Sequence, residues 1–153
     1  MKTALLLCAI LLRAGAGLGQ QITPDLVPPL AFVELQKQYP LAANVRWAKT
    51  HGLYEARFVL DQAPHVIRYR PNGDLEATVT DLAGTSALPA PVQRMLGLRY
   101  SDLTFCKVAK IENVKTGDVT YETESCDTDN PDVITFTPDG REVHRPRPKH
   151  RPQ

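Results

Sequence analysis

Apolar residues recur every three or four positions in two short stretches of the chain and alternate with polar residues in much of the rest. Three apolar residues of each stretch share one face of a helix: Phe32, Leu35 and Tyr39 in the first, and Val92, Met95 and Leu96 in the second. Prolines stand at the start of both stretches, where a first helical turn tolerates them, and Pro40 ends the first stretch. The pattern predicts two helices, each followed by strands.

The strand regions contain an internal echo. Residues 65–75 read HVIRYRPNGDL, and residues 132–142 read DVITFTPDGRE. Similar residues are separated by the same offset of 67: Val66 and Val133, Ile67 and Ile134, Tyr69 and Phe136, Pro71 and Pro138, Gly73 and Gly140, Tyr54 and Tyr121, and Glu55 and Glu122. We therefore predict an α+β fold built as a tandem repeat, in which each unit is a helix followed by four antiparallel strands.

The turn residues predict the register of the first hairpin. Pro71, Asn72 and Gly73 fit a three-residue loop that ends with a glycine in the left-handed conformation. Residues whose numbers sum to 144 then lie opposite each other: Tyr69 with Leu75 and Ile67 with Ala77 on an apolar face, and Arg68 with Glu76 and Arg70 with Asp74 on a charged face.

A similar loop at 115–117 predicts the register of a later hairpin, with opposite residues summing to 232. Ile111 then faces Tyr121 on the core side, and Lys110 faces Glu122 on the other side. Cys106 and Cys126 also sum to 232, so their Cα atoms would lie close enough for a disulfide. We predict this bond, which in the chain-entropy account stabilises the fold by about 3 kcal/mol. Two free thiols in a slightly different register are the alternative.

Composition and charge place the chain among exported proteins. It is 42% hydrophobic and 23% charged, which suits one globular domain. Residues 1–19 read as a cleavable signal peptide, with an apolar run too short to span a membrane, so we expect no transmembrane segment after cleavage. Cleavage leaves 16 basic and 17 acidic residues, which gives no reason to expect nucleic acid as a partner. Residues 20–27 are a predicted linker, and 144–153 are a basic, proline-rich tail.

The sequence resembles a known family over residues 28–143. The segments AFVELQKQYPLAANVRWAKTHGLYEARFVL and RYRPNGDL, with a weaker second copy in LPAPVQRMLGLRYSDLTF, VTYETES and ITFTPDGRE, are similar to the PepSY-like, beta-lactamase-inhibitor-like proteins of bacterial envelopes. The resemblance implies one unit at 28–84 and a second at 85–143, with both helices on one face of a curved antiparallel sheet. It also implies a periplasmic or secreted location, and it brings no catalytic motif.

Two departures from the family pattern concern the second unit. Its first strand begins with Phe105 and Cys106 instead of a Val-x-Trp pattern, and its last strand runs into the proline-rich tail. The glycine-containing loop before that strand would pair Phe136 with Glu142, an unusual apolar and charged pair.

Side chains with familiar catalytic or metal-binding spacing are missing from the sequence. It contains no CxxC, HExxH, GxSxG or phosphate-loop motif. The segment DTDNPD at 127–132 lacks the glycine and the distant glutamate of a calcium loop, so an acidic turn is the better interpretation. We predict no catalytic residues, no metal and no cofactor.

The predicted pairings leave a charged sheet face without a helix over it. Its exposed residues would be Arg46, Glu55, Arg57, Arg68, Arg70 and Glu76 in the first unit, and Lys110, Glu112, Glu122 and Glu124 in the second. Our leading hypothesis is that this face binds another envelope protein without catalysis, with inhibition of that protein as one form of such binding. Ordinary solvation of a polar face is the alternative.

Two other functions fit the same sequence. A groove between the two units could sense a small molecule or a metal ion. The basic tail could attach the protein to an anionic glycolipid or phospholipid at the cell surface. The sequence gives neither the partner nor the oligomeric state.

Overall fold

The computed structural model describes residues 20–127 and 131–143. The predicted signal peptide, the basic tail and most of the DTDN portion of the acidic turn lie outside these residues. Within them, no helix is long and apolar enough to cross a membrane. The elements in chain order are β1 (Gln20–Ile22), η1 (Pro24–Leu26), α1 (Pro29–Gln38), β2 (Ala43–Thr50), β3 (Leu53–Leu60), β4 (Ala63–Tyr69), β5 (Leu75–Asp81), η2 (Thr85–Ala87), α2 (Ala90–Arg99), β6 (Phe105–Asn113), β7 (Val119–Ser125) and β8 (Val133–Phe136).

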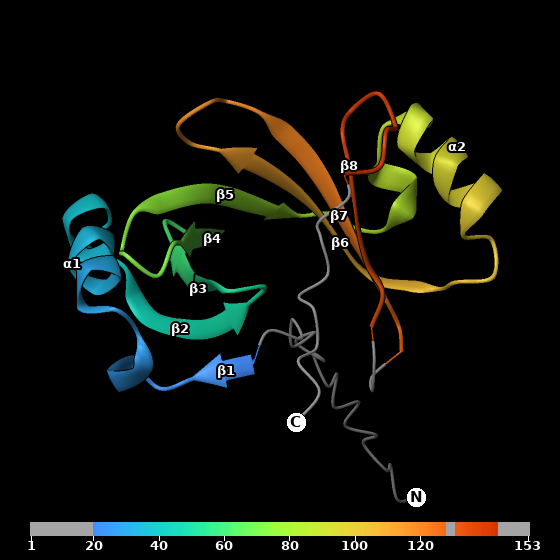
Figure 1. Cartoon of the computed structure of the whole chain (residues 1–153). Coiled ribbons are helices and arrows are strands. Elements are labelled where there is room, and N and C mark those ends of the chain that lie inside the picture. Colours follow the sequence, from blue (N-terminus) through green and yellow to red (C-terminus); the bar gives the residue numbers. More distant parts are fainter. Residues whose placement is uncertain (1–19, 128–130, 144–153) are drawn as a thin grey trace, which may run out of the picture.

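The strands form a single antiparallel sheet in which every strand pairs with its neighbours in the chain, in the order β1 to β8 (Figure 1). Part of the predicted linker 20–27 therefore extends the sheet as β1. After α2 the described residues form three strands and not the predicted four. An isolated bridge between Phe136 and Glu142 stands where the fourth strand was expected. The predicted pairing of these two residues is confirmed.

Both helices pack on the same face of the sheet, at its two ends. Ala31 and Leu35 of α1 are buried against a cluster that includes Trp47, Phe58 and Tyr69. Val92 and Leu96 of α2 are buried with the following residues of the last three strands: Val108, Ile134 and Phe136. Directly opposed residues of neighbouring strands share a face, and the pairings from β3 to β8 place both clusters on one side.

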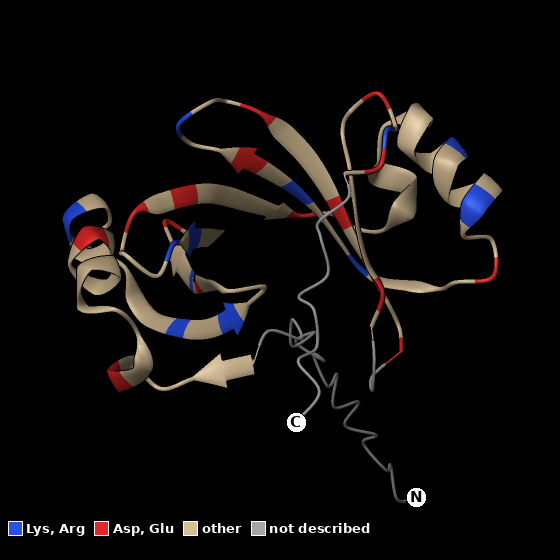
Figure 2. Cartoon of the chain, in the orientation of Figure 1, with Lys and Arg blue, Asp and Glu red and all other residues tan. Residues whose placement is uncertain are grey.

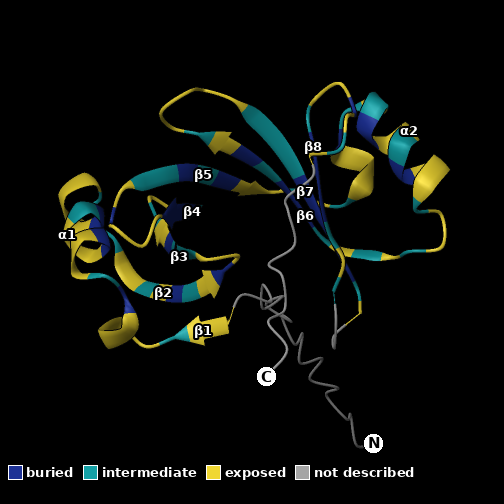
Figure 3. Ribbon diagram, in the orientation of Figure 1, coloured by how far each residue is buried: buried dark blue, intermediate teal, exposed yellow. Residues whose placement is uncertain are grey.

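The opposite side, which we call the helix-free face, is the inner side of a strongly curled sheet. Strands β4 and β7 are three strand spacings apart, or about 14 Å in a flat sheet. Even so, the side chain of Arg68 on β4 hydrogen-bonds directly to Glu122 on β7. Five apolar residues of this face are buried within the curl: Val66, Ala77, Val79, Ala109 and Ile111. Figure 3 shows that burial concentrates along the strands, while the outer sides of the helices are exposed.

The first hairpin has the predicted loop and part of the predicted register. The amide of Arg70 donates to the carbonyl of Asp74, and Tyr69 lies opposite Leu75, as predicted. Beyond this point Glu76 is an extra residue in β5, so Arg68 faces Ala77 and Ile67 faces Thr78. The predicted pairs Ile67 with Ala77 and Arg68 with Glu76 are therefore wrong. A β-bulge of this kind shifts every later pair by one residue.

The later hairpin is one residue out of the predicted register. Its loop is 114–117 and not 115–117, because the Asn113 side chain accepts hydrogen bonds from the amides of Lys115 and Thr116. Ile111 therefore faces Thr120, and Lys110 faces Tyr121.

A second irregularity makes Cys106 an extra residue of β6, and the two cysteines are still in contact. The register shifts again between Phe105 and Lys107. Cys106 and Cys126 are joined by a disulfide, with their Cα atoms 5.0 Å apart. The predicted bond is confirmed, although the register used to predict it was wrong.

Two glycines of equivalent position bring a hairpin against each helix. Gly73 and Gly140 both have φ of +86°, which an L side chain rarely adopts. A Cβ atom on Gly73 would lie 2.3 Å from the Cβ of Leu30, and one on Gly140 would lie 2.8 Å from the carbonyl oxygen of Pro91. The first turns of α1 and α2 are thus held by corresponding loops, which fits the sequence echo.

Candidate functional site

The structure divides the predicted site residues between two faces and two environments. The helix-free face carries Arg46, Glu55, Arg57, Arg68, Glu122 and Glu124, as the strand pairings show. Lys110 and Glu112 lie on the opposite face, between the helices, because the real register turns them over. Arg70 is exposed at the loop that follows β4. Charges of both signs occur at both ends of the sheet (Figure 2).

Four of these residues are buried, contrary to the expectation that the whole face is exposed. The relative exposure is 2% for Glu55, 1% for Arg68, 3% for Glu122 and 6% for Glu124. The prediction included a curved sheet but assigned exposure from strand alternation alone, whereas the curl folds the two ends of this face toward each other. A partner protein therefore cannot reach the middle of the helix-free face.

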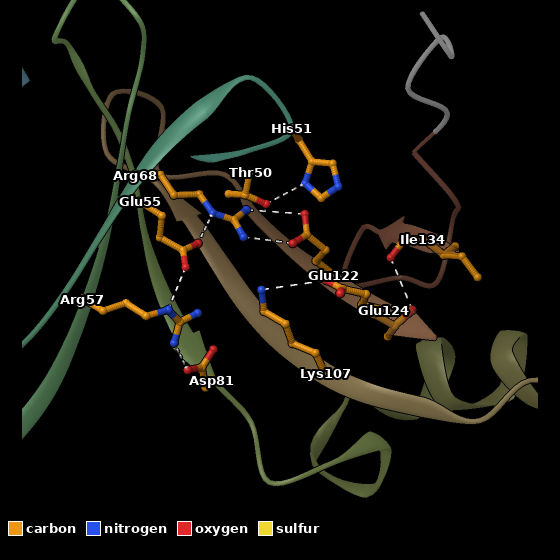
Figure 4. Close-up of polar contacts among 11 residues, drawn as sticks. Thr50, His51, Glu55, Arg57, Arg68, Asp81, Lys107, Glu122, Glu124 and Ile134 are labelled. Carbon is orange, nitrogen blue, oxygen red and sulfur yellow. Dashed lines mark hydrogen bonds and ion pairs between the residues drawn. The ribbon is translucent and has the colours of Figure 1, made fainter. Parts of the chain in front are cut away.

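Arg68 holds the centre of this buried region between two carboxylates from different strands (Figure 4). Its Nε donates to Glu55 Oε2 at 2.9 Å, and its Nη2 donates to Glu122 Oε1 at 2.9 Å. Burial lowers the pKa of Arg68, but the adjacent Glu122 and Glu55 raise it by more, so the net shift is upward. The guanidinium is thus charged and connects β3, β4 and β7.

Arg57 extends the network toward the edge of the face. Its Nε donates to Glu55 Oε1 at 2.8 Å, and its Nη1 donates to Asp81 Oδ2 at 2.7 Å. Burial lowers the pKa of Arg57, but the hydrogen bond to Asp81 and the charge of Glu55 raise it by more, so the net shift is upward. On the other side of the centre, Lys107 Nζ lies 3.9 Å from Glu124 Oε2. We call Glu55, Arg57, Arg68, Asp81 and Glu122 the charge network.

The charge network differs from the pairs expected for an open polar face. Glu76 hydrogen-bonds to Arg70 and not to Arg68, and Lys110 pairs with Glu112 at 3.1 Å and not with Glu122. The network sits beside the apolar residues of the curl, where a charge without a partner costs several kcal/mol. The members of the charge network therefore hold one another in fixed positions, and they support the residues at the edge of the face.

An open groove of about 460 Å³ lies at that edge, over β2, β3 and β4. Arg46 and Arg57 face each other directly across β2 and β3, and both line the groove. A β-bulge between Ala43 and Arg46 puts Asn44 at its mouth, with a φ of +53°. Val59 and Pro64 are opposite each other on the same face and supply apolar surface. We call this the rim groove.

Two cationic groups of the rim groove have hydrogen-bonding capacity left over. The Nη2 of Arg57 is buried and has no hydrogen-bond partner, although the rest of its guanidinium is engaged. Arg46 is exposed and makes no ion pair with the described part of the chain. Arg46 can bind an anionic or carbonyl oxygen from outside, whereas Nη2 of Arg57 is covered in this structure.

The site offers no arrangement for side-chain catalysis or metal binding. Across residues 20–127 and 131–143, no group of three or more His, Cys, Asp or Glu side chains could hold a metal ion. His51 lies at the β2–β3 turn, where its Nδ1 is 3.2 Å from the Thr50 hydroxyl, and His65 stacks on Phe58. Of these two histidines, only His65 lines the rim groove, whose described donors suit recognition by charge and hydrogen bonding.

Sequence reasoning missed three contributors to the site. Asp81 and Lys107 were not assigned because their partners are on distant strands, and Asn44 depends on a bulge. The like-charged pair Arg46 and Arg57 was the available signal, because the short β2–β3 turn at His51 and Gly52 sets them opposite each other.

No protein-family model matches the sequence, and no curated protein is similar to it. Solved structures are similar in fold. A "putative periplasmic" protein of Bacteroides eggerthii matches with a TM-score of 0.57 and 21% identity over 77% of this chain and 86% of its own. A DUF2874 family protein of Bacteroides ovatus gives 0.55 and 21% over 77% and 85%. A BLIP-like protein of Bacteroides fragilis gives 0.51 and 19% over 75% and 82%. The fold of this chain, a curled antiparallel sheet of eight strands with two helices, is thus similar to that of BLIP-like and DUF2874 proteins.

Proposed function

We propose that this protein is a non-catalytic binding module of the bacterial envelope that recognises another envelope protein through the rim groove. The proposal rests on a difference within the helix-free face. The charged side chains of its interior have hydrogen-bond partners, whereas some donors at its edge do not. In the interior, Arg68 is fully paired. At the edge, Arg46 is exposed without an ion pair and Arg57 has one buried donor without a partner, beside apolar surface in which Val59 is 60% exposed.

Several further features of the chain support this proposal without identifying the partner. A periplasmic location fits the predicted signal peptide and the description of the Bacteroides eggerthii neighbour. An oxidising compartment also suits the Cys106–Cys126 disulfide. The equivalent glycine contacts of the two helices fit an origin by tandem repetition of a PepSY-like unit. Inhibition of the partner is one outcome that such binding could have.

The proposal is tested by affinity capture from an envelope extract of the source organism. The mature protein is used as bait beside a variant that carries Arg46→Glu and Val59→Lys, two exposed positions of the rim groove. Arg68 is left unchanged because its replacement would disturb the buried interior. We expect a protein that the native bait retains and the variant loses.

A matched control variant carries Lys110→Glu and Glu112→Lys on the helix-bearing face, which exchanges charges without touching the groove. It should retain the partner. Equal retention by all three folded baits would contradict recognition through the rim groove. Retention of no specific protein by the native bait would contradict the binding of an abundant envelope protein altogether.

A further inference from the structure

The rim groove has the chemistry of a carboxylate site. We propose, on the basis of the function proposed above, that the rim groove binds the carboxylate of an acidic side chain flanked by apolar residues on the partner protein. Arg46 and Arg57 would bind the carboxylate, and the neighbouring apolar surface would contact the flanking residues. The proposal specifies the part of the partner that this groove recognises.

The electrostatic argument starts from two like charges in direct opposition. Arg46 and Arg57 are cross-strand partners, and like charges at such positions destabilise a sheet unless an anion offsets them. Asp81 offsets Arg57 through its contact with Nη1 at 2.7 Å, but Arg46 has no such partner in the described residues. Glu55 also pairs with Arg57 at 2.8 Å, so the charge of Arg57 is already offset, and the exposed charge of Arg46 is the one that favours an anionic ligand.

The hydrogen-bonding argument concerns the geometry of Arg57. Its Nε and Nη1 are fixed by Glu55 and Asp81, which hold the guanidinium plane and leave Nη2 as the buried donor without a partner. A donor that is buried and unpaired destabilises the fold. Nη2 is covered by neighbouring atoms, so a carboxylate oxygen would reach it only after those atoms move, and its second oxygen would then face Arg46. The orientation of the guanidinium plane is thus set before the ligand arrives, whereas access to Nη2 is not.

The apolar part of the groove limits the kind of carboxylate that fits. Val59 is 60% exposed, and Pro64 lies directly opposite it at the open end. Val66 continues this surface toward the interior and lines the same groove. An acidic residue between aliphatic neighbours covers this surface, whereas an acidic residue in a fully polar segment would leave it in water.

The test is a titration of ¹⁵N-labelled mature protein with two short peptides blocked at both ends, Ac-Val-Glu-Val-NH2 and Ac-Val-Gln-Val-NH2. We follow the backbone amide of Arg46 and the Nε–H signal of Arg57 by NMR. The glutamate peptide should produce saturable shifts at both residues with a dissociation constant in the millimolar range. The glutamine peptide, which has the same shape without the charge, should bind at least tenfold more weakly.

Two variants separate the site from general charge attraction. Arg46→Gln should weaken the glutamate peptide at least fivefold, and Lys110→Gln on the opposite face should leave its binding unchanged. Arg57 is not replaced, because its loss would also release Glu55 and Asp81. Equal binding of both peptides, or an equal effect of the two variants, would overturn the proposal.

A third titration, with hexanoate, identifies the source of the carboxylate. Binding of hexanoate without binding of the glutamate peptide would assign the groove to a small organic acid and overturn the proposal. The result is independent of the capture experiment. If the rim groove captures a protein but the glutamate peptide produces no shifts, the proposed function stands and only the proposal of a carboxylate ligand fails.

Discussion

Replacement of Arg68 by methionine should reveal how much the buried interior of the helix-free face contributes to stability. Arg68→Met keeps a long flexible side chain but removes the guanidinium that binds Glu55 and Glu122 at 2.9 Å each. Glu55 keeps Arg57 as a partner, and Glu122, which is 3% exposed, loses the hydrogen bonds from the guanidinium. Breaking a buried ion pair from one side costs about 3–5 kcal/mol.

The magnitude can be measured by urea denaturation of the native protein and the variant. With a urea dependence of about 2 kcal/mol per molar, typical of a small protein, a loss of about 4 kcal/mol lowers the midpoint by about 2 M. Such a loss is a large share of the roughly 5–15 kcal/mol that stabilises a domain. The variant should therefore be folded only marginally at room temperature.

A double variant separates loss of charge pairing from loss of packing. Arg68→Met with Glu122→Leu removes both charges, so most of the lost stability should return, because a buried ion pair and an apolar replacement of similar volume are often nearly equal in energy. Arg70→Met, at an exposed pair with Glu76, is the surface control and should leave the midpoint unchanged. A loss below about 1 kcal/mol in Arg68→Met, a value typical of solvated pairs, would refute the buried network.

Three other outcomes follow from the structure. Cys106→Ser with Cys126→Ser should lower stability by about 3 kcal/mol, the cost of opening a 20-residue loop, and the native protein should show no free thiol when unfolded without reductant. In calorimetry Gly73→Ala should lower the melting temperature more than Gly52→Ala does, because both have φ near +80° but only Gly73 lies against the first turn of α1. Burial raises the pKa of Tyr69 above the ordinary value of 10, so stability from this phenol is present below pH 10 and is lost as pH rises through the native pKa. An ultraviolet titration should find one tyrosine that ionises only on alkaline unfolding; ionisation near pH 10 in the folded protein would contradict this.

Local sequence signals predicted the elements of this fold well because those signals act over a few residues. Prolines and apolar periodicity placed both helices between Pro28 and Tyr39 and between Pro89 and Tyr100. The PNG loop predicted the pairing of Tyr69 with Leu75. Registers failed where one residue was inserted, at Glu76 and at the start of the 114–117 loop, because a bulge leaves almost no trace in the pattern. The disulfide formed despite the error, because Cys106 is the extra residue of a second irregularity in β6 and lies close to Cys126.

The candidate site could be predicted only in part, because burial depends on curvature that no short pattern records. Arg46 and Arg68 both alternate with apolar residues in strands, and nothing local separates the exposed one from the one that is 1% exposed. The difference arises from the curl that brings Glu122 of β7 to Arg68 of β4. That contact uses the donors of Arg68, whereas Arg46, at the edge of the same face, is exposed and makes no ion pair within the described residues. The curvature of the sheet therefore decides which arginines are buried in ion pairs and which stay exposed at its edge.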